Sequence, residues 1–369
     1  MLNYICINCK SSYPLESHQW KCDCGGLLSL EYEKEAVDFS ETFLSRQHSL
    51  WKYIDALPFE KEDVWQEITL GEGDTPLIKI SENVYAKAEY YMPTLSFKDR
   101  GAVLLIAMAK KLKANRVIAD SSGNAGTAIA AYGARAGIQC DIFVPDSASN
   151  KKMKQIEAHG AVIHKVPGTR ENTAKAAIAM VEKTNAFYAS HIYNPIFREG
   201  TKTFVYEVFE QMNGKMPDAF IIPVGNGTLL MGAYIALREL MASGQIDKMP
   251  KILAVQAENC APIEQAFAAG RNTVEPIDNA GTLAEGIAIA APARGTEILQ
   301  AIRESGGDII GVTEESIIHA RDALALKGIY VEITSAVNYA GYLRYIEKYP
   351  ELKEQQVIFP LCGAGIKSD

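Results

Sequence analysis

Four short segments of the chain carry residues that could do chemistry, and each follows a stretch with the composition of a buried strand. The first is Ser96-Phe97-Lys98-Asp99-Arg100-Gly101, which opens a predicted helix. The positive end of a helix dipole and the neighbouring Arg100 both disfavour the charged form of Lys98. A neutral amine can attack an aldehyde, so Lys98 is a candidate nucleophile, with a solvated surface lysine as the alternative.

The second segment is Ser121-Ser122-Gly123-Asn124-Ala125-Gly126-Thr127, between a predicted strand and a predicted helix. Its small residues allow close approach of the backbone to a flat ligand. The amide of Asn124 can donate to a phenolate oxygen, and the backbone N–H groups can receive a carboxylate. An ordinary turn with a serine cap is the alternative.

The third segment is Gly225-Asn226-Gly227-Thr228-Leu229, whose N–H groups and following helix predict a phosphate cradle. A Walker loop is excluded because its lysine is absent. A dinucleotide fingerprint requires a third glycine where this chain has Leu230, although Glu258 could serve as the ribose-binding acid. A hydride-transferring enzyme would leave the first two segments without a role, so that alternative ranks lower.

The fourth segment is Pro360-Leu361-Cys362-Gly363-Ala364-Gly365 after a predicted strand. Cys362 could contact a ring nitrogen through a weak S–H hydrogen bond. The alternative is a small buried apolar side chain, which is the more common role of a lone cysteine.

Four further cysteines lie near the N-terminus, as Cys6 with Cys9 and Cys22 with Cys24. Two such pairs predict two tight turns around one tetrahedral zinc, in a ribbon-like element of residues 1–35. The second pair is C-x-C rather than C-x-x-C, and a metal-free ribbon is the alternative. Four protein ligands would close the site, so a metal there would be structural.

The composition excludes several classes of partner. The 369 residues have a formal net charge of -8, with no run of like charges that would attract nucleic acid or an anionic membrane. No secretory signal and no apolar run of roughly 18 residues stands out. We therefore expect a soluble, cytoplasmic protein.

Short β-branched runs alternate with amphipathic stretches through most of the chain, which predicts an α/β fold with mostly parallel sheets. Ligands in such sheets bind beyond the carboxyl ends of the strands. The segment from about Glu31 to Trp65 is charged and has a helical pattern. The predicted strands are 84–89, 117–120, 140–144, 161–166, 219–224, 252–256, 308–312 and 356–359, and the predicted helices are 102–113, 127–136, 151–159, 174–183 and 229–242.

Together the four segments resemble the tryptophan-synthase-β type of pyridoxal-phosphate enzymes, known as fold type II, and within it the threonine synthase family. The resemblance covers nearly the whole chain. Besides the cysteine block, it is carried by Gly71-Glu72-Gly73-Asp74-Thr75-Pro76-Leu77, Pro93-Thr94, Ser96 to Gly101, Ser122-Gly123-Asn124, Asn194-Pro195, Glu199-Gly200, Lys202-Thr203 and Pro223 to Leu229.

The resemblance implies a cofactor, pyridoxal phosphate, and a role for each segment. Lys98 would hold the cofactor as a Schiff base and Asn124 would contact its 3'-oxygen. Cys362 would lie opposite the pyridine nitrogen. The cofactor phosphate would bind to Gly225, Asn226, Gly227, Thr228 and Leu229, and the substrate would contact Thr94, Ser96, Ser121 and Ser122.

The resemblance also implies two open twisted domains around a cofactor cleft. We expect residues 36–86 and 195–369 to form the large domain and residues 87–194 the small one. A homodimer acting on a small amino acid is expected. Candidate contacts for an anion are Arg198, Lys202, Lys151 and Lys152, and a solvated surface role is the favoured alternative for the last two.

The sequence contains features of two different reactions. A threonine synthase would convert O-phosphohomoserine and water to threonine and phosphate. The family usually has Asn-Pro-Thr-Gly-Ser where this chain has Met92-Pro93-Thr94-Leu95-Ser96, which makes the edge of the pocket less polar. The sequences Asn124-Ala125-Gly126 and Ala284-Glu285-Gly286-Ile287-Ala288, with Cys362, look more like serine or threonine dehydratases. A lyase or β-replacement enzyme and an inactive cofactor-binding regulator are the alternatives.

Overall fold

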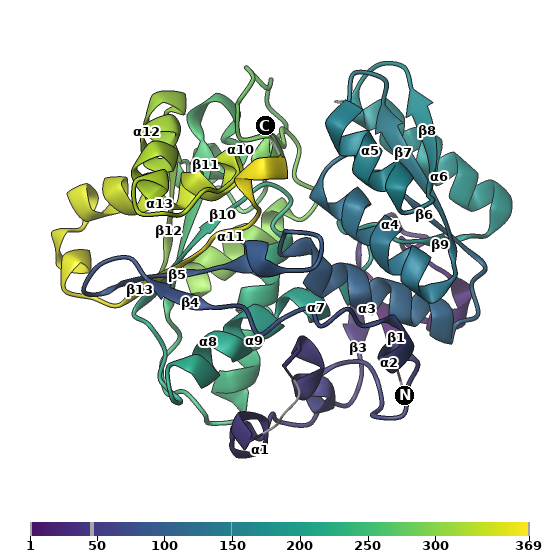
Figure 1. The fold of residues 1–369 in the computed structure, drawn as a ribbon, viewed down its shortest axis with the longest axis horizontal. Coiled ribbons are helices and arrows are strands. Elements are labelled where there is room, and N and C mark those ends of the chain that lie inside the picture. Colours follow the sequence, from purple (N-terminus) through teal and green to yellow (C-terminus); the bar gives the residue numbers. More distant parts are fainter. Residues whose placement is uncertain (1, 45–47, 149, 368–369) are drawn as a thin grey trace. The chain divides into compact units, whose positions relative to one another are not determined.

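The computed structural model describes residues 2–44, 48–148 and 150–367 (Figure 1). The chain divides into two compact units. The first unit comprises Met1–Gly73 and Lys98–Thr201, and the second comprises Asp74–Phe97 and Lys202–Asp369. Among the residues described, no helix is both long and apolar enough to cross a membrane.

The boundaries of these units differ from the predicted domains. Residues 36–73 belong to the first unit, because Trp51 and Tyr132 both donate hydrogen bonds to the buried carboxylate of Glu72. Residues 87–97 belong to the second unit, where the N–H of Phe97 donates to the carbonyl of Cys362 at 2.9 Å. These long-range contacts are invisible in the local sequence pattern, and the predicted domain division remains a prediction.

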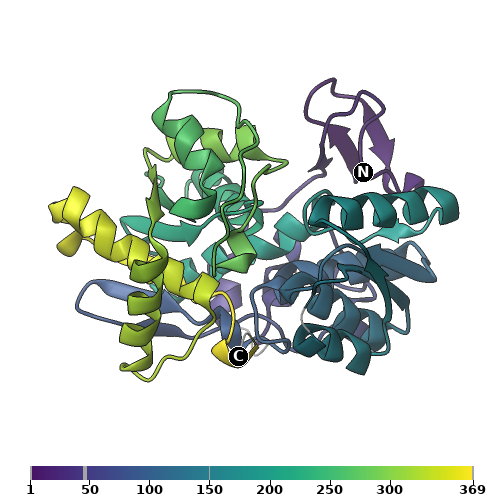
Figure 2. The ribbon, with the colours of Figure 1, turned by 90° about the horizontal axis from the view of Figure 1, so that it is seen from above.

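The first unit begins with a small antiparallel sheet in the order β2-β1-β3. Its strands are β1 (Asn3–Cys6), β2 (Ser12–Pro14) and β3 (Leu28–Glu31). Figure 2 shows them in purple as a small layer of their own. This sheet agrees with the prediction of a zinc-ribbon-like element.

The connection after the ribbon has less helix than its charged pattern predicts. It contains only three short helical segments among its described residues, and large rings pack between two of them, with Trp51 stacked on Trp65 at 4.9 Å between ring centroids. Packing of large rings therefore takes precedence over helical periodicity here. The segments are α1 (Phe39–Leu44), η2 (Leu50–Ala56) and α2 (Trp65–Ile68).

The second sheet of the first unit is wholly parallel, in the order β8-β7-β6-β9. The chain runs outward from β6 to β8 and returns to add β9 on the other side of β6, so the strand order reverses between β6 and β9. Its strands are β6 (Arg116–Ala119), β7 (Gln139–Pro145), β8 (Val162–Val166) and β9 (Phe187–Tyr188), and its helices are α3 (Lys98–Lys111), α4 (Asn124–Ala136), α5 (Asn150–Ala158), α6 (Arg170–Thr184) and α7 (Ile196–Thr201).

The second unit contains a six-stranded sheet in the order β12-β11-β10-β13-β5-β4, parallel except for the edge strand β4. The last strand, β13, lies between β10 and β5, which is where the chain order changes direction. The strands are β4 (Leu77–Lys79), β5 (Val84–Lys87), β10 (Ala219–Pro223), β11 (Lys251–Ala257), β12 (Asp308–Val312) and β13 (Val357–Pro360).

One apolar core joins the strands of this sheet to a long helix, α13 (Ile333–Lys348). The core includes Val84, Ala219, Val255 and Val312 from four strands and Tyr345 from the helix. The α/β class and the mostly parallel sheets predicted from the sequence are confirmed. The remaining helices of the unit are α8 (Thr203–Gln211), α9 (Thr228–Ala242), α10 (Pro262–Ala268), α11 (Gly295–Glu304) and α12 (Glu314–Ala325).

Candidate active site

Lys98 is the first residue of α3 in the first unit, so this helix begins four residues before its predicted start at Ala102. Its Nζ atom lies 5.6 Å from the ring centroid of Phe197. The position of that ring is fixed by Gly101, because a Cβ atom at Gly101 would lie 2.4 Å from the Phe197 ring. The glycine of the Lys98 segment therefore allows α3 and α7 to pack closely, which orients the lysine at the start of its helix.

A buried histidine near Lys98 was missed by the sequence analysis. His191 follows β9, a strand of two residues that is too short to give a periodic signal. Its ring makes an edge contact with Phe197 at 5.9 Å. Burial lowers the pKa of His191 well below its usual value, and the charges of Lys98 and Arg170 lower that pKa further. The imidazole is therefore neutral near pH 7.

Asn124 is the first residue of α4, and the two serines precede it after β6. Among these residues Ser121 is buried, whereas Ser122 and Asn124 are half-buried. A Cβ atom at Gly126 would lie 1.8 Å from the carbonyl oxygen of Ser121. Gly126 is thus required by the packing of the helix on the strand end. The loops after β6 and β9 leave the same edge of the sheet, where its strand order reverses and ligands bind in such folds.

In the second unit, Gly225 to Gly227 lead from β10 into α9. Gly227 has a φ of 75°, and no side chain from the described part of the chain caps the helix at this residue. The first N–H groups of a helix have no intrahelical partner, so this end of α9 can receive a phosphate. Both glycines are also required by packing, because Cβ atoms there would approach Ile289 to 2.8 Å and Ile298 to 2.5 Å.

The same unit brings the segment before Lys98 beside Cys362. Ser96 pairs with Gly363 in an isolated bridge, and the N–H of Ala364 donates to the carbonyl of Leu95 at 3.1 Å. Cys362 is 1% exposed. The hydroxyl of Ser96 is buried and has no hydrogen-bond partner among the described residues. The candidate substrate contact Ser96 and the candidate ring-nitrogen contact Cys362 therefore belong to one local structure.

The segments around Ser96 and Cys362 and the loop after β10 lie at the same edge of the six-stranded sheet, because β5 and β10 both pair in parallel with β13. The uncapped N-terminus of α9 fits a phosphate group, and the buried hydroxyl of Ser96 fits a polar ligand. The residues of the second unit are therefore suited to pyridoxal phosphate.

Two of the candidate anion contacts have internal partners instead. Lys202 is fully buried and its Nζ atom lies 3.1 Å from Oε2 of Glu239. Arg198 is also buried, and its guanidinium donates to the carbonyl of Leu28 at 3.3 Å. Both cations hold the fold together, which their local sequence does not reveal. The side chains of Lys151 and Lys152 lie outside the described part of the chain.

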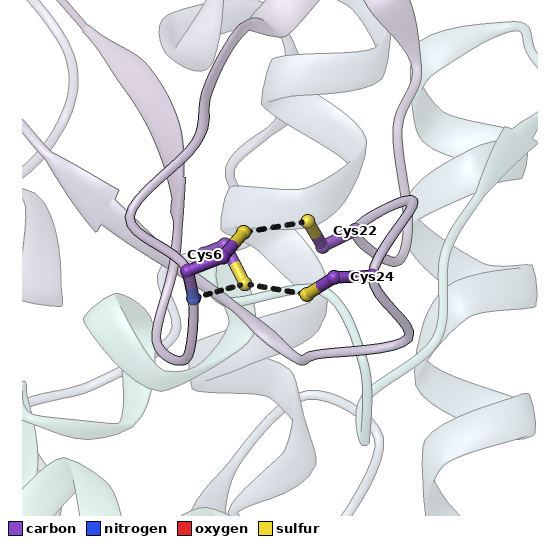
Figure 3. Close-up of side chains that lie close together, drawn as sticks. Cys6, Cys22 and Cys24 are labelled. Atoms are coloured by element: carbon purple, nitrogen blue, oxygen red, sulfur yellow. Dashed lines mark hydrogen bonds between the residues drawn. The ribbon is translucent and has the colours of Figure 1, made fainter.

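The four N-terminal cysteines converge on one point. Their Sγ atoms all lie within 4.8 Å of one another. Figure 3 shows the sulfurs of Cys6, Cys22 and Cys24 directed toward a common centre. The predicted ligand set is therefore brought together by the ribbon.

Comparison with known proteins places these features in a family. Residues 68–363 match the model of a pyridoxal-phosphate dependent enzyme, and this range includes Lys98, Asn124, the glycine loop and Cys362. The threonine synthase of Methanosarcina acetivorans is 35% identical over 100% of this chain and 92% of its own. That of Methanocaldococcus jannaschii is 32% identical over 98% of this chain and 92% of its own.

Among solved structures, a threonine deaminase from T.th. has a TM-score of 0.64 and 27% identity, covering 76% of this chain and 87% of that one. The chain is therefore similar in sequence to threonine synthases and in fold to a threonine deaminase. The sequence match to the Methanosarcina acetivorans protein covers all the predicted site residues. The resemblance identified from the sequence is confirmed, and with it the cofactor. The chain belongs to the family of pyridoxal-phosphate-dependent enzymes.

Proposed function

We propose that this chain is a threonine synthase, a lyase that converts O-phosphohomoserine and water to L-threonine and phosphate. In this reaction the phosphate leaves Cγ of the substrate, and water then adds its hydroxyl at Cβ. The proposal rests on one observation above all, that two relatives named threonine synthase match 98% or more of this chain.

Bound pyridoxal phosphate supplies an electron-withdrawing ring that stabilises negative charge at the substrate α-carbon. We assign the proton transfers to Lys98, whose amine takes one proton from Cα and one from Cβ and, after phosphate has left, returns protons to Cγ and Cα. Asn124, the glycine loop and Cys362 would hold the cofactor at its oxygen, phosphate and ring nitrogen.

Substrate binding is assigned to four hydroxyl groups. Ser121 and Ser122 would receive the substrate carboxylate at the start of α4, where the helix dipole favours an anion. Thr94 and Ser96 would line the edge of the pocket, and the buried hydroxyl of Ser96 is suited to a polar ligand group. We further propose that the protein is a cytoplasmic homodimer.

An amino-acid ammonia-lyase acting on serine or threonine is the second candidate. Leu95 favours it, because a leucine replaces the glycine that threonine synthases usually have before the lysine. The similarity to a threonine deaminase structure at 27% identity supports the same alternative. A simple deamination needs no site for a second phosphate group, so the less polar pocket edge would be no obstacle.

A panel of substrates separates the two candidates. The purified chain with pyridoxal phosphate is given O-phosphohomoserine, L-threonine and L-serine, and inorganic phosphate, threonine, ammonia and keto acid are measured. A threonine synthase releases phosphate and threonine in equal amounts from the first substrate. Ammonia and keto acid from threonine or serine, with no phosphate from O-phosphohomoserine, would instead establish the lyase. The Lys98→Ala variant is the control for enzyme-independent release.

A further inference from the structure

We propose that Cys6, Cys9, Cys22 and Cys24 bind one zinc ion, and that this closed metal site supports the strand end that precedes Asn124. Four thiolates at the corners of a tetrahedron with Zn–S bonds of about 2.3 Å would lie roughly 3.8 Å apart. Two sulfur pairs lie near that distance, Cys9 with Cys22 at 3.4 Å and Cys6 with Cys24 at 3.6 Å. The geometry is therefore nearly that of a tetrahedral site.

The backbone around the first pair has the form of a metal-binding turn. The N–H groups of Asn8 and Cys9 point at Sγ of Cys6, at 3.4 Å and 3.5 Å. Such donors stabilise a thiolate. The turn closes when the N–H of Lys10 donates to the carbonyl of Cys6 at 3.1 Å, with Lys10 in the left-handed conformation at a φ of 64°.

The second turn explains the C-x-C spacing that departs from the usual pattern. The N–H of Gly25 donates to the carbonyl of Cys22 at 2.8 Å, and that of Cys22 donates to the carbonyl of Gly26 at 2.9 Å. Gly25 has a φ of 81°, so it reverses the chain one residue after Cys24. A Cβ atom at Gly26 would lie 2.7 Å from Sγ of Cys6. The two glycines thus bring the shorter pair up to the first one.

Disulfide bonds between the four cysteines are the alternative to a bound metal ion. A disulfide requires sulfurs about 2.05 Å apart, and the two pairs at 3.4 Å and 3.6 Å are more than an ångström beyond that distance. Each sulfur has three others as near neighbours, which a metal needs and a disulfide does not. Cys6 and Cys22 are buried and Cys9 and Cys24 are exposed, so the ion could enter from the solvent side.

A chain of contacts leads from the ribbon to the candidate active site. Trp20, two residues before Cys22, makes edge contacts with Tyr188 at 5.8 Å and with Tyr193 at 5.2 Å. The hydroxyl of Tyr188 donates to Asp120 at 2.9 Å. Asp120 directly precedes Ser121. An ordered ribbon therefore holds the tyrosine that fixes the end of β6.

The first experiment measures metal. The full chain, purified without added chelator, should contain one zinc per molecule by mass spectrometry, and cobalt substitution should give the absorption bands of a tetrahedral thiolate site. The double variant Cys9→Ser/Cys24→Ser should contain none, whereas Cys260→Ser, which changes a buried cysteine outside the cluster, should keep its zinc. Two results would overturn the metal site. One is a wild-type chain that contains no metal. The other is a count of fewer than seven free thiols after denaturation and chelation, because the chain has seven cysteines.

The second experiment tests the support of the strand end, with cofactor affinity as its readout. The apparent Kd for pyridoxal phosphate, followed by its visible absorbance, should rise about tenfold in Cys9→Ser/Cys24→Ser and in Trp20→Ala. Trp20→Phe should restore the affinity, because a phenyl ring keeps the edge contacts. Both Trp20 variants should keep zinc, whereas the double cysteine variant should lose it. Unchanged affinity in both weakened variants would refute the coupling while leaving the metal site established.

Discussion

The hydroxyl of Tyr188 donates a 2.9 Å hydrogen bond to Oδ1 of Asp120, and both side chains are buried. The two residues end β9 and follow β6, neighbouring parallel strands at the point where the order of their sheet reverses. Burial raises the pKa of Asp120 to about 6, and the tyrosine hydroxyl opposes that rise. A buried carboxyl group with a raised pKa thus precedes the candidate substrate-binding serines.

We predict that Asp120 makes the stability of the protein depend on pH. Its pKa is higher in the folded chain than in the unfolded chain, so the folded state binds more protons between pH 4 and 6. Stability is therefore lost as the pH rises through that range, and between pH 5 and 7 the free energy of unfolding should fall by about 1 kcal/mol from this group alone. Urea denaturation at both pH values should show a smaller fall in Asp120→Asn. Equal falls in the two proteins would contradict the assignment.

Replacing Lys98 by alanine should abolish the visible absorbance of the lysine-bound cofactor and lower turnover on the order of 10³-fold or more. The matched control is Lys111→Ala, at the last turn of the same helix, where the lysine pairs with Asp63 at 2.7 Å. That variant should keep both the absorbance and the activity. A wild-type chain that stays colourless after addition of pyridoxal phosphate would refute the role of Lys98.

Leu95 occupies a backbone conformation that favours glycine. Its φ is 63°, and its N–H and carbonyl are held by hydrogen bonds to Met92 and Ala364. The chain thus keeps the shape expected of a glycine at this position while carrying a leucine. Leu95→Gly should raise the free energy of unfolding by about 1 kcal/mol, because it relieves the left-handed strain.

The control Leu95→Ala keeps a Cβ atom and should therefore gain no stability. If the side chain of Leu95 also limits binding of a phosphorylated substrate, both variants should turn over O-phosphohomoserine faster than the wild type. Thermal or urea denaturation measures the first effect and phosphate release the second. A less stable Leu95→Gly variant would show that the leucine side chain contributes more by packing than it costs in strain.

A fully buried ion pair stabilises the second unit. Nζ of Lys87 on β5 lies 2.6 Å from Oε2 of Glu207 on α8. The same carboxylate accepts the N–H groups of Asp74 at 2.8 Å and Thr75 at 3.2 Å. The Gly71 to Leu77 motif is thereby anchored to a helix that lies far away in the sequence.

Removing one partner leaves the other charge buried, so Lys87→Met should lower the free energy of unfolding by about 3–5 kcal/mol. The double variant Lys87→Met/Glu207→Gln should lose less than the sum of the two single variants, by about 1 kcal/mol or more. Urea denaturation of the four proteins provides the cycle. Additive losses would show that the two charges do not stabilise each other.

Much of the secondary structure could be predicted because it depends on local periodicity. The predicted strands 140–144, 219–224 and 308–312 overlap β7, β10 and β12, respectively. They could be predicted because buried parallel strands are continuous apolar runs. Segments whose structure depends on distant partners were not predictable in the same way. The two-residue strand β9 exists through its pairing with β6, and the connection after the ribbon is shaped by stacked tryptophans.

The sequence by itself determined the family, the candidate lysine, the strand-end turns and the spacing of the cysteines, because these depend on residue type and order along the chain. Only the tertiary structure decided which groups surround them. It placed neutral His191 near Lys98, buried Lys202 against Glu239, and assigned Gly225 and Gly227 a packing role as well as a predicted phosphate site. Burial and charge are properties of neighbours in space, and they are set by contacts between residues that lie far apart in the chain.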